Sequence, residues 1–455
     1  MKVHFIAIGG SVMSNLAVSM AKLGHQITGS DDQIVEPSKS KLLDAGLMPD
    51  TIGWDVSKIT EDLDAVILGK HALADNPELV KAQELGVKIY SFPEFIYEQS
   101  VDKTRVVIAG TYGKTTIISM IMHVLKKLKR DFDYLVGAKL EGFDSLIRLT
   151  STAPIILIEG DEYFASSIDS HAKFHYYQPN IALVSNIQWD NFQMVISEEE
   201  YLRLFELFVE TIIPKGALIY NKEDENVLEV VDRTKALKIN RHGYKTPAYT
   251  INKGVTYVQF SDQQIPLQII GKQNLSNIAG AYTVCEWLGV KQEEFYEAIK
   301  DFKSSIRYLE FVSSEKGSVV YQDFAHTPLK LRSSIHAVKE QFPKSNLLTV
   351  IELNPYDVQE GEKLSQYENS MDESDWSVVF LNKSTIKDNN LQVEEIIDKI
   401  TFAFKHPHLL VITSSEDLHQ YLRDFDCSGT NMLFMSSDHY SGLNILTYAE
   451  EFYKQ

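Results

Sequence analysis

The amino-acid sequence predicts an α/β protein, and three observations support this class. Short apolar runs of strand length alternate along the chain with segments of helical periodicity. A glycine turn follows the first apolar run, and a Gly-Lys-Thr loop follows a later one. With 455 residues, the chain has the length of two to four domains.

The first candidate binding element is the glycine turn near the N-terminus. A strand-like run at Val3–Ile8 leads into Gly9–Ser11, and apolar residues at helical spacing follow. A second strand-like run, Gln26–Asp32, ends in two acids about 20 positions after the turn. The glycines let the backbone approach a pyrophosphate, and Asp31 can reach a sugar or base. Because the full G-x-G-x-x-G pattern is absent, an NAD-dependent enzyme is disfavoured; a tight turn without a ligand is the alternative.

The second candidate element is a phosphate-binding loop. The apolar run Val106–Ile108 predicts a buried strand, which breaks into Gly110–Thr116 and continues with helical spacing. In this context the loop amides and the helix N-terminus face an anion, and Lys114 adds a positive charge. The Thr115 hydroxyl can ligate magnesium. The pattern therefore favours a nucleoside triphosphate site over an ordinary strand-to-helix turn.

Other polar side chains come directly after strand-like runs or at helix starts. Glu159 ends the run that begins at Ile155, and two more acids follow it. A carboxylate at this place, downstream of a phosphate loop, typically binds magnesium, whereas a solvated acidic turn is the alternative. Asn274 and Asn277 precede a helix predicted at Ile278–Leu288 and share one helical face. Two such amides either read an adenine edge or cap the helix.

Composition narrows the class of protein. The chain has 44 Lys and Arg against 63 Asp and Glu, a net charge of −19, which argues against a nucleic-acid partner. Its two cysteines, Cys285 and Cys427, form neither a disulfide framework nor a zinc-ligand pattern, so we expect a cytoplasmic protein. The first residues predict a strand rather than a secretion signal, and no apolar run reaches membrane-spanning length.

Several motifs together resemble the Mur ligase family of peptidoglycan synthesis. They are IAIGGSVMSNLA, TGSDD, ADNPEL, GTYGKTT, EGDEY, VSN followed by WDN, and GKQNLSN. The resemblance covers the whole chain and implies three domains. A Rossmann-like N-terminal domain (1–101) would bind a UDP-sugar, and a central P-loop ATPase-type α/β domain (102–305) would bind ATP. A Rossmann-like C-terminal α/β domain (306–455) would close over ATP and bind the amine substrate.

The resemblance also implies a reaction. Within the family, EGDEY and the residues after it look most like the murein peptide ligase branch, which joins L-alanyl-γ-D-glutamyl-meso-diaminopimelate to UDP-N-acetylmuramate. ATP and Mg²⁺ would activate the substrate carboxylate as an acyl phosphate, which the amine then attacks. The alternatives are ligation of L-alanine to the same nucleotide sugar, or a non-catalytic paralogue that still binds nucleotide. We expect a monomer or homodimer without membrane insertion.

The family pattern assigns residues to each site. Catalytic roles fall to Lys114, Glu159, Arg307 and His326. ATP would be held by Gly110, Thr111, Gly113, Lys114, Thr115, Thr116, Asn186, Gln273, Asn274, Asn277, Arg307 and Asp323. The nucleotide sugar would be held by Gly9, Gly10, Ser11, Met13, Ser30, Asp31 and His71, although a surface-loop position is the alternative for the histidine. Magnesium would be bound by Thr115, Glu159 and Asn191.

The chain departs from the family pattern on the ATP side. Tyr112, Asn191 and Gln273 stand where the family commonly has histidine. An amide oxygen can still ligate magnesium, and Gln273 can still hydrogen-bond adenine, but neither reproduces an imidazole. The non-catalytic alternative rests on these positions. Lys114, Thr115, Glu159, Arg307 and Asp323 follow the family pattern, which favours the active ligase.

Overall fold

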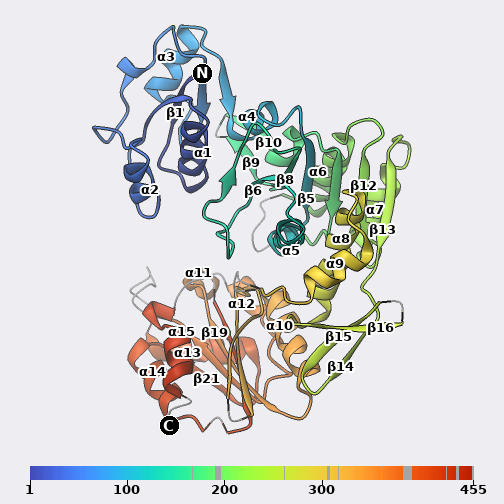
Figure 1. Ribbon diagram of the computed structural model, residues 1–455. Helices are drawn as coiled ribbons and strands as arrows, with labels where there is room; N and C mark the ends of the chain where they lie inside the picture. The colour runs from blue at the N-terminus through green and yellow to red at the C-terminus, as the bar shows by residue number, and fades with distance from the viewer. Residues whose placement is uncertain are drawn as a thin grey trace. The chain divides into compact units, whose positions relative to one another are not determined.

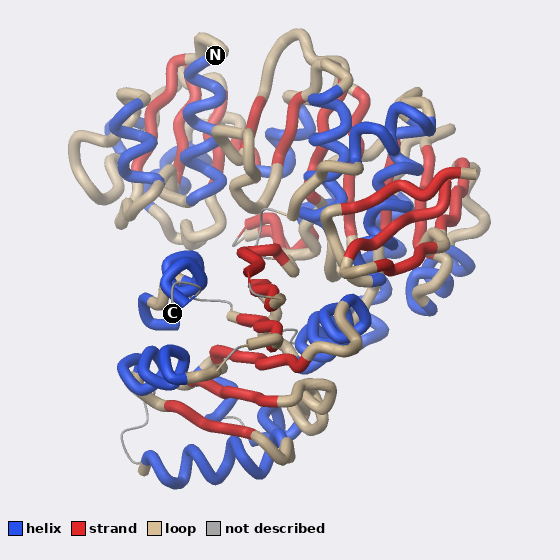
Figure 2. The backbone as a smooth tube through the Cα atoms, turned by 60° about the horizontal axis from the view of Figure 1, so that its bottom comes forward, coloured by secondary structure: helices blue, strands red, loops and turns tan. Residues whose placement is uncertain are grey.

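The computed structural model describes residues 1–166, 168–189, 196–260, 262–304, 308–315, 317–359, 361–382, 392–426, 428–436 and 440–452. It confirms the α/β class, with helices between the strands of largely parallel sheets (Figures 1 and 2). Backbone contacts divide the chain into two compact units, Met1–Thr246 with Ser276–Ile299, and Pro247–Leu275 with Lys300–Gln455. The boundaries 1–101, 102–305 and 306–455 stay a prediction, and these contacts place residues 247–275 with the C-terminal part of the chain.

The first unit begins with a four-stranded parallel sheet of order β2-β1-β3-β4. Its strands are β1 (Lys2–Ile6), β2 (Gln26–Ser30), β3 (Ala65–Leu68) and β4 (Ile89–Ser91), and its helices are α1 (Ser11–Lys22), α2 (Ser38–Asp44), α3 (Pro77–Glu84) and α4 (Phe92–Glu98). This is the expected βαβ arrangement. The first strand ends two residues before the predicted Ile8, because Ala7 has a φ of 66° and leaves the extended conformation.

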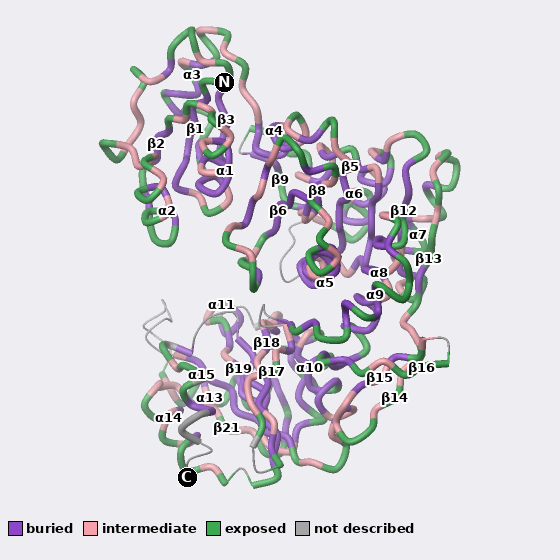
Figure 3. Tube along the Cα trace, in the orientation of Figure 1, coloured by how far each residue is buried: buried purple, intermediate pink, exposed green. Residues whose placement is uncertain are grey.

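The second sheet of the first unit has seven strands in the order β13-β12-β11-β5-β8-β6-β7, and only β7 runs antiparallel to its neighbour. The strands are β5 (Thr104–Ala109), β6 (Asp133–Leu135), β7 (Ile147–Arg148), β8 (Ile155–Glu159), β11 (Ile181–Val184), β12 (Ala217–Asn221) and β13 (Asn240–Tyr244). A separate hairpin comprises β9 (Phe164–Ser166) and β10 (Asp169–Ala172). The central strands are buried on both faces, as Figure 3 shows, which explains their continuous apolar runs.

Five helices lie between or after these strands in the sequence: α5 (Lys114–Lys127), α6 (Glu198–Glu210), α7 (Glu225–Arg233), α8 (Lys272–Trp287) and α9 (Gln292–Ile299). Helix α8 begins at Lys272, so the prediction of a start at Ile278 was wrong, and both Asn274 and Asn277 lie inside the helix. Gly271, with a φ of 87°, is the break that precedes it.

The second unit contains two sheets. One is a three-stranded antiparallel sheet of β14 (Tyr249–Asn252), β15 (Val255–Phe260) and β16 (Gln263–Leu267), which we did not predict. The other has the order β17-β18-β22-β19-β20-β21 and is parallel except for β17. Its strands are β17 (Glu310–Glu315), β18 (Ser318–Asp323), β19 (Asn346–Glu352), β20 (Trp376–Phe380), β21 (Leu409–Ile412) and β22 (Thr430–Met435).

The helices of the second unit are α10 (Pro328–Gln341), α11 (Pro355–Gln359), α12 (Gly361–Ser365), α13 (Val393–Phe404), α14 (Ser415–Asp424) and α15 (Ile445–Phe452). Helix α10 begins at Pro328, a residue suited to the first helical turn, and its side chains Leu331, Ile335 and Val338 are buried. Within the described residues, no helix combines the length and the apolar character needed to cross a membrane.

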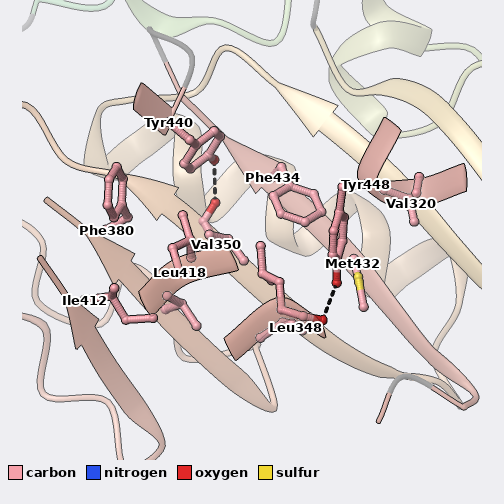
Figure 4. Close-up of a cluster of buried hydrophobic side chains, with 13 residues drawn as sticks. Val320, Leu348, Val350, Phe380, Ile412, Leu418, Met432, Phe434, Tyr440 and Tyr448 are labelled. Carbon is pink, nitrogen blue, oxygen red and sulfur yellow. Dashed lines mark hydrogen bonds between the residues drawn. The ribbon is translucent and has the colours of Figure 1, made fainter. Parts of the chain in front are cut away.

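The core of the second unit is an apolar cluster on one side of the six-stranded sheet (Figure 4). It includes Phe434 of β22, whose ring packs edge to face against Tyr440 and Tyr448. Both tyrosines are buried, and each donates its hydroxyl to a backbone carbonyl, that of Val350 and that of Leu422, at 2.8 Å. The hydroxyls are thereby satisfied within an otherwise apolar cluster.

Replacement of Phe434 by alanine is expected to lower the free energy of unfolding by about 3–5 kcal/mol, since it removes a fully buried aromatic ring and leaves a cavity. Urea denaturation followed by circular dichroism measures the change. The matched control is Phe402→Ala, because Phe402 is 78% exposed and its truncation leaves no cavity. Equal effects of the two substitutions would contradict the assignment of Phe434 to the core.

Candidate functional site

The candidate site lies where three neighbouring parallel strands end. β5 pairs with β11 on one side and with β8 on the other, so their carboxyl ends meet at one edge of the sheet. The loop Gly110–Gly113 follows β5, Glu159 closes β8, and Asn186 comes just after β11. Three elements that are far apart in the sequence therefore meet at this edge.

Two glycines give the loop its shape. Gly110 has a φ of 136°, and a Cβ atom there would overlap the Ser185 hydroxyl. Gly113 has a φ of 83° and precedes α5; a Cβ atom there would lie 2.6 Å from Oδ1 of Asn277. Only glycine fits both positions without strain, and the backbone stays open to a ligand. The backbone N–H groups of Lys114–Thr116 lie in the first turn of α5, where they have no acceptor within the helix, and they face the loop.

The side chain of Asn186 fixes the loop. Its Oδ1 accepts a hydrogen bond from the backbone N–H of Tyr112 at 2.8 Å, and its Nδ2 donates to the carbonyl of the same residue at 2.9 Å. The Thr111 hydroxyl lies 3.0 Å from the hydroxyl of Tyr201 and accepts from the backbone N–H of Gln188 at 2.9 Å. Asn186, which we predicted to hold ATP, thus bonds the loop backbone at Tyr112. Thr111, predicted for the same role, ties the loop to α6 and to the segment after β11.

The side chain of Lys114 is buried and has two polar partners. Its Nζ lies 3.0 Å from Oε2 of Glu162 and donates to the carbonyl of Gly110 at 2.6 Å. Burial alone would lower the pKa of Lys114, but the nearby carboxylates of Glu162, Asp161 and Glu159 outweigh it and raise the pKa. The ammonium is thus charged at neutral pH and is already placed against the loop that would take a phosphate chain.

Thr115 and Glu159 form the pair that fits magnesium. The Thr115 hydroxyl donates to Oε1 of Glu159 at 2.7 Å, and the backbone N–H of Gly137 donates to Oε2 at 2.8 Å. Burial, reinforced by the charge of Asp161, raises the pKa of Glu159. A hydroxyl and a carboxylate are hard oxygen ligands, and magnesium takes its other ligands from water and phosphates. The described residues contain no cluster of three or more His, Cys, Asp or Glu side chains arranged to hold a metal alone.

The remaining predicted ATP residues occupy different surroundings. Thr116 is buried in the first turn of α5, and Asn277 lies against Gly113. Asn274 donates from Nδ2 to the carbonyl of Ile270 at 2.9 Å, within the second unit. Gln273 is exposed at the start of α8. The structure therefore places Asn277 beside the loop. Asn274 and Gln273 belong to the second compact unit, and their surroundings are given within that unit.

In the N-terminal sheet, the predicted acid stabilises the glycine turn. Oδ2 of Asp31 accepts the backbone N–H of Gly9 at 2.6 Å, and burial raises the pKa of this carboxyl. A Cβ atom on Gly9 would come within 2.8 Å of the same oxygen, so glycine is required. Ser30 is fully buried, and its hydroxyl has no partner among the described residues.

Three other residues predicted at the nucleotide-sugar site lie around the same turn. Gly10 caps the start of α1, Ser11 is exposed, and Met13 is 6% exposed and points into the core. His71 is exposed in the loop after β3. Beside it, the ammonium of Lys70 lies 5.6 Å from the ring centroid of Tyr163, so this loop adjoins the start of the β9–β10 hairpin.

In the second unit, Asp323 ends β18 and is buried. Its Oδ2 accepts the Ser334 hydroxyl at 2.6 Å and its Oδ1 accepts the backbone N–H of Ala325 at 3.0 Å. Burial nevertheless raises the pKa of this carboxyl to about 6. Nδ1 of His326 lies 2.9 Å from the carbonyl of Phe324. Arg307 and Asn191, which we assigned to ATP and magnesium, lie outside the described residues.

Sequence reasoning missed two residues of the loop environment. Gly137 supplies the N–H that holds Glu159, and it follows β6, the strand beside β8. Its place after a strand of the same sheet was a usable signal. Tyr201 contacts the Thr111 hydroxyl from α6, and its hydroxyl also lies 3.5 Å from Oε1 of Glu162. Nothing in its sequence context indicated this position.

Comparisons with known proteins match this architecture. Residues 2–103 match the model described as "Mur ligase family, catalytic domain", and residues 108–285 match "Mur ligase middle domain". Among sequence relatives, the UDP-N-acetylmuramate–L-alanine ligase of Caldicellulosiruptor bescii is 31% identical over 352 residues, 74% of this chain and 75% of that protein. The enzyme of the same name from Carboxydothermus hydrogenoformans is 27% identical, over 74% of this chain and 73% of that protein.

Solved structures share the fold along the whole chain. The UDP-N-acetylmuramate–alanine ligase of Thermotoga maritima has a TM-score of 0.68 at 20% identity, covering 100% of this chain and 98% of that one. The murein peptide ligase of Psychrobacter arcticus has a TM-score of 0.62 at 20% identity, with the same coverage. At these identities the structures establish the three-domain α/β architecture.

Replacement of Gly110 by alanine is expected to abolish nucleotide binding, because the new Cβ atom overlaps the Ser185 hydroxyl and the φ of 136° strains any side chain. Isothermal titration with ATP and magnesium measures the loss. Gly24→Ala is the matched control: its φ is 87°, but a Cβ atom there meets nothing within 4 Å. The control should lose about 1 kcal/mol of stability and keep its nucleotide affinity. Normal ATP binding by the Gly110 variant would refute the assigned loop geometry.

The Asp323 carboxyl predicts a dependence of stability on pH. Its folded pKa, about 6, lies above the reference value of 3.8, so the folded state holds this proton more tightly than the unfolded state. Its contribution is therefore present at low pH and is lost as the pH rises from about 4 to about 6, in total about 3 kcal/mol. Urea denaturation at several pH values measures the slope. Asp323→Asn should flatten it over this window, and an unchanged slope would contradict the burial argument.

Proposed function

Because the chain belongs to the Mur ligase family, whose members are ATP-dependent ligases that form C–N bonds, we propose that it joins a murein peptide to UDP-N-acetylmuramate. The peptide is L-alanyl-γ-D-glutamyl-meso-diaminopimelate, and the reaction belongs to peptidoglycan synthesis and recycling. The family resemblance stated from the motifs is confirmed, and the choice of amine substrate is the proposal.

The observation that carries the proposal is the charged Lys114 beside the Thr115–Glu159 pair at the end of β5 and β8. When bound, ATP and magnesium supply the phosphoryl group that turns the substrate carboxylate into an acyl phosphate, from which the amine displaces phosphate. Lys114 would steady the β- and γ-phosphates, and Thr115 and Glu159 would hold the metal. Gly110 and Gly113 leave the loop backbone free for the phosphate chain.

The acids around Lys114 support a role in triphosphate binding. The ammonium pairs with Glu162 at 3.0 Å, so the positive charge is compensated in a buried place. A triphosphate brings more negative charge than one carboxylate and competes for the same ammonium. Binding then needs no large movement of Lys114, since the carbonyl of Gly110 already holds its Nζ at 2.6 Å.

The amine substrate distinguishes two ligases. The order of residues from Glu159 to Pro179 favours the murein peptide, and the sequence relatives named above favour L-alanine. We propose the peptide because the residues of this segment look most like one branch of the family. In either case UDP-N-acetylmuramate is the proposed carboxylate substrate, bound by the glycine turn Gly9–Ser11 and Asp31.

Lys114→Ala is expected to lower phosphate release by at least about 10²–10³-fold, since it removes the cation that stabilises the transferring phosphoryl group. The assay contains UDP-N-acetylmuramate, ATP, magnesium, and either tripeptide, dipeptide or L-alanine. Binding of the nucleotide sugar, measured by titration, should be nearly unchanged. The wild-type protein should release phosphate fastest with the tripeptide.

Lys126→Ala is the control, because Lys126 is an exposed lysine near the end of the same helix. Thermal unfolding of both variants shows whether they are folded. Fastest release with L-alanine would transfer the assignment to the alternative ligase. Release with none of the three amines by wild-type protein would favour the nucleotide-binding paralogue, to which Tyr112 and Gln273 point.

A further inference from the structure

A buried tyrosine of α6 connects the phosphate loop with the carboxylate that pairs with Lys114. Tyr201 lies near the start of α6 and is fully buried, and its ring packs edge to face against Phe205 with 5.4 Å between the ring centroids. Its hydroxyl oxygen lies 3.0 Å from that of Thr111 and 3.5 Å from Oε1 of Glu162. Core packing explains the ring, whereas the hydroxyl reaches the site.

The order of donors and acceptors in this chain of contacts follows from the carboxylate at its end. Glu162, which pairs with an ammonium, can only accept hydrogen bonds. Since a hydroxyl carries one proton, Tyr201 donates to Glu162 and accepts from Thr111. The Thr111 oxygen in turn accepts the backbone N–H of Gln188 at 2.9 Å. Burial and the charge of Glu162 raise the pKa of Tyr201, so its hydroxyl keeps the proton that it donates.

Glu162 has two hydrogen-bond donors in the described part of the chain. The Lys114 ammonium lies 3.0 Å from Oε2, and the Tyr201 hydroxyl lies 3.5 Å from Oε1. The side chain of Glu162 is 4% exposed, so water does little to solvate its charge. A distance of 3.5 Å is long for a hydrogen bond from a hydroxyl, so this contact is weak while Lys114 compensates the carboxylate. It can shorten and strengthen when that compensation decreases.

A bound triphosphate decreases that compensation. Its phosphates compete with Glu162 for the Lys114 ammonium, which the carbonyl of Gly110 holds in place at 2.6 Å. A buried carboxylate that loses its share of the cation is costly unless another donor takes over. Tyr201 is in position to do so, because α6 and the packing against Phe205 hold its ring beside Oε1.

We propose that Tyr201 is a positioning residue for triphosphate binding, whose hydroxyl stabilises Glu162 as Lys114 turns from this carboxylate to the phosphates. The inference rests on the proposed function, since it requires that Lys114 binds the triphosphate of ATP. In this role Tyr201 acts through Glu162 on Lys114 and needs no contact with ATP. Its hydrogen bond is stronger when ATP is bound than before, and such a difference is what changes an affinity.

Titration calorimetry with magnesium and either ATP or AMP tests the proposal on Tyr201→Phe. The substitution removes the hydroxyl and keeps the ring that packs against Phe205. The ATP dissociation constant should rise about tenfold, the loss of one hydrogen bond to a charged group. The affinity for AMP should stay unchanged, because AMP lacks the β- and γ-phosphates that compete for Lys114. An unchanged ATP affinity, or equal losses for ATP and AMP, would overturn the proposal.

The same titration in a second background separates this role from a purely structural one. Glu162→Gln removes the negative charge that Tyr201 stabilises. In that background, the further change Tyr201→Phe should alter the ATP affinity by less than about twofold. A tenfold loss in both backgrounds would mean that Tyr201 acts on the loop through Thr111 alone, which contradicts the proposal.

Tyr448→Phe is the matched control. It removes another buried tyrosine hydroxyl, which donates to the carbonyl of Leu422 at 2.8 Å in the apolar cluster of the second unit. This variant should unfold at a lower temperature than wild-type protein and keep its ATP affinity. A tenfold loss of ATP affinity here as well would make the effect a general one of a lost buried hydroxyl and would refute the role of Tyr201.

The outcome is separate from that of the ligase proposal, since the titrations contain neither the amine nor the nucleotide sugar. Wild-type protein that binds ATP but forms no amide bond would refute the ligase and leave the test of Tyr201 intact. Wild-type protein that binds no ATP would refute the triphosphate site and the role of Tyr201 with it.

Discussion

The parallel pairing of β5 between β8 and β11 is the constraint on which the site depends. This pairing brings the Gly110–Gly113 loop, Glu159 and Asn186 to one edge of a buried sheet, although they are spread along the sequence. The strands can be parallel because each connection crosses over and returns the chain to the same end of the sheet: α5, β6 and β7 lie between β5 and β8, and the β9–β10 hairpin and a short 3-10 helix lie between β8 and β11. A polar site then forms at the one place where these apolar strands leave the core.

At that edge, most side chains hold the backbone rather than face solvent. Asn186 hydrogen-bonds both the N–H and the carbonyl of Tyr112. In the smaller sheet, Asp31 accepts a hydrogen bond from the backbone N–H of Gly9. Such bonds fix a loop before its ligand arrives, so less conformational entropy is lost on binding. The N-terminal and central parts thus use one device twice: a short polar side chain on a neighbouring strand end that fixes a glycine turn.

The sequence predicted those features that local chemistry determines. The strand predicted at Val106–Ile108 and the glycine loop that follows it both derive from short-range rules on apolar runs and glycine. The antiparallel sheet β14–β16 was not predicted because its polar strands lack an apolar run. The alternation of apolar and polar residues in Val255–Phe260 was nevertheless a signal for a strand. Tyr201 and Gly137 were not predicted as site residues because their contacts there depend on tertiary packing alone. The early start of α8 was missed because Gly271 was interpreted as part of a loop motif rather than as the break before a helix.

The distribution of charge explains how so acidic a protein can serve anionic ligands. With a net charge of −19, the average field repels a triphosphate or a nucleotide sugar, so binding requires local cations where the acids are few or already paired. Lys114 meets this requirement by burial beside Glu162, in a place where water screens little.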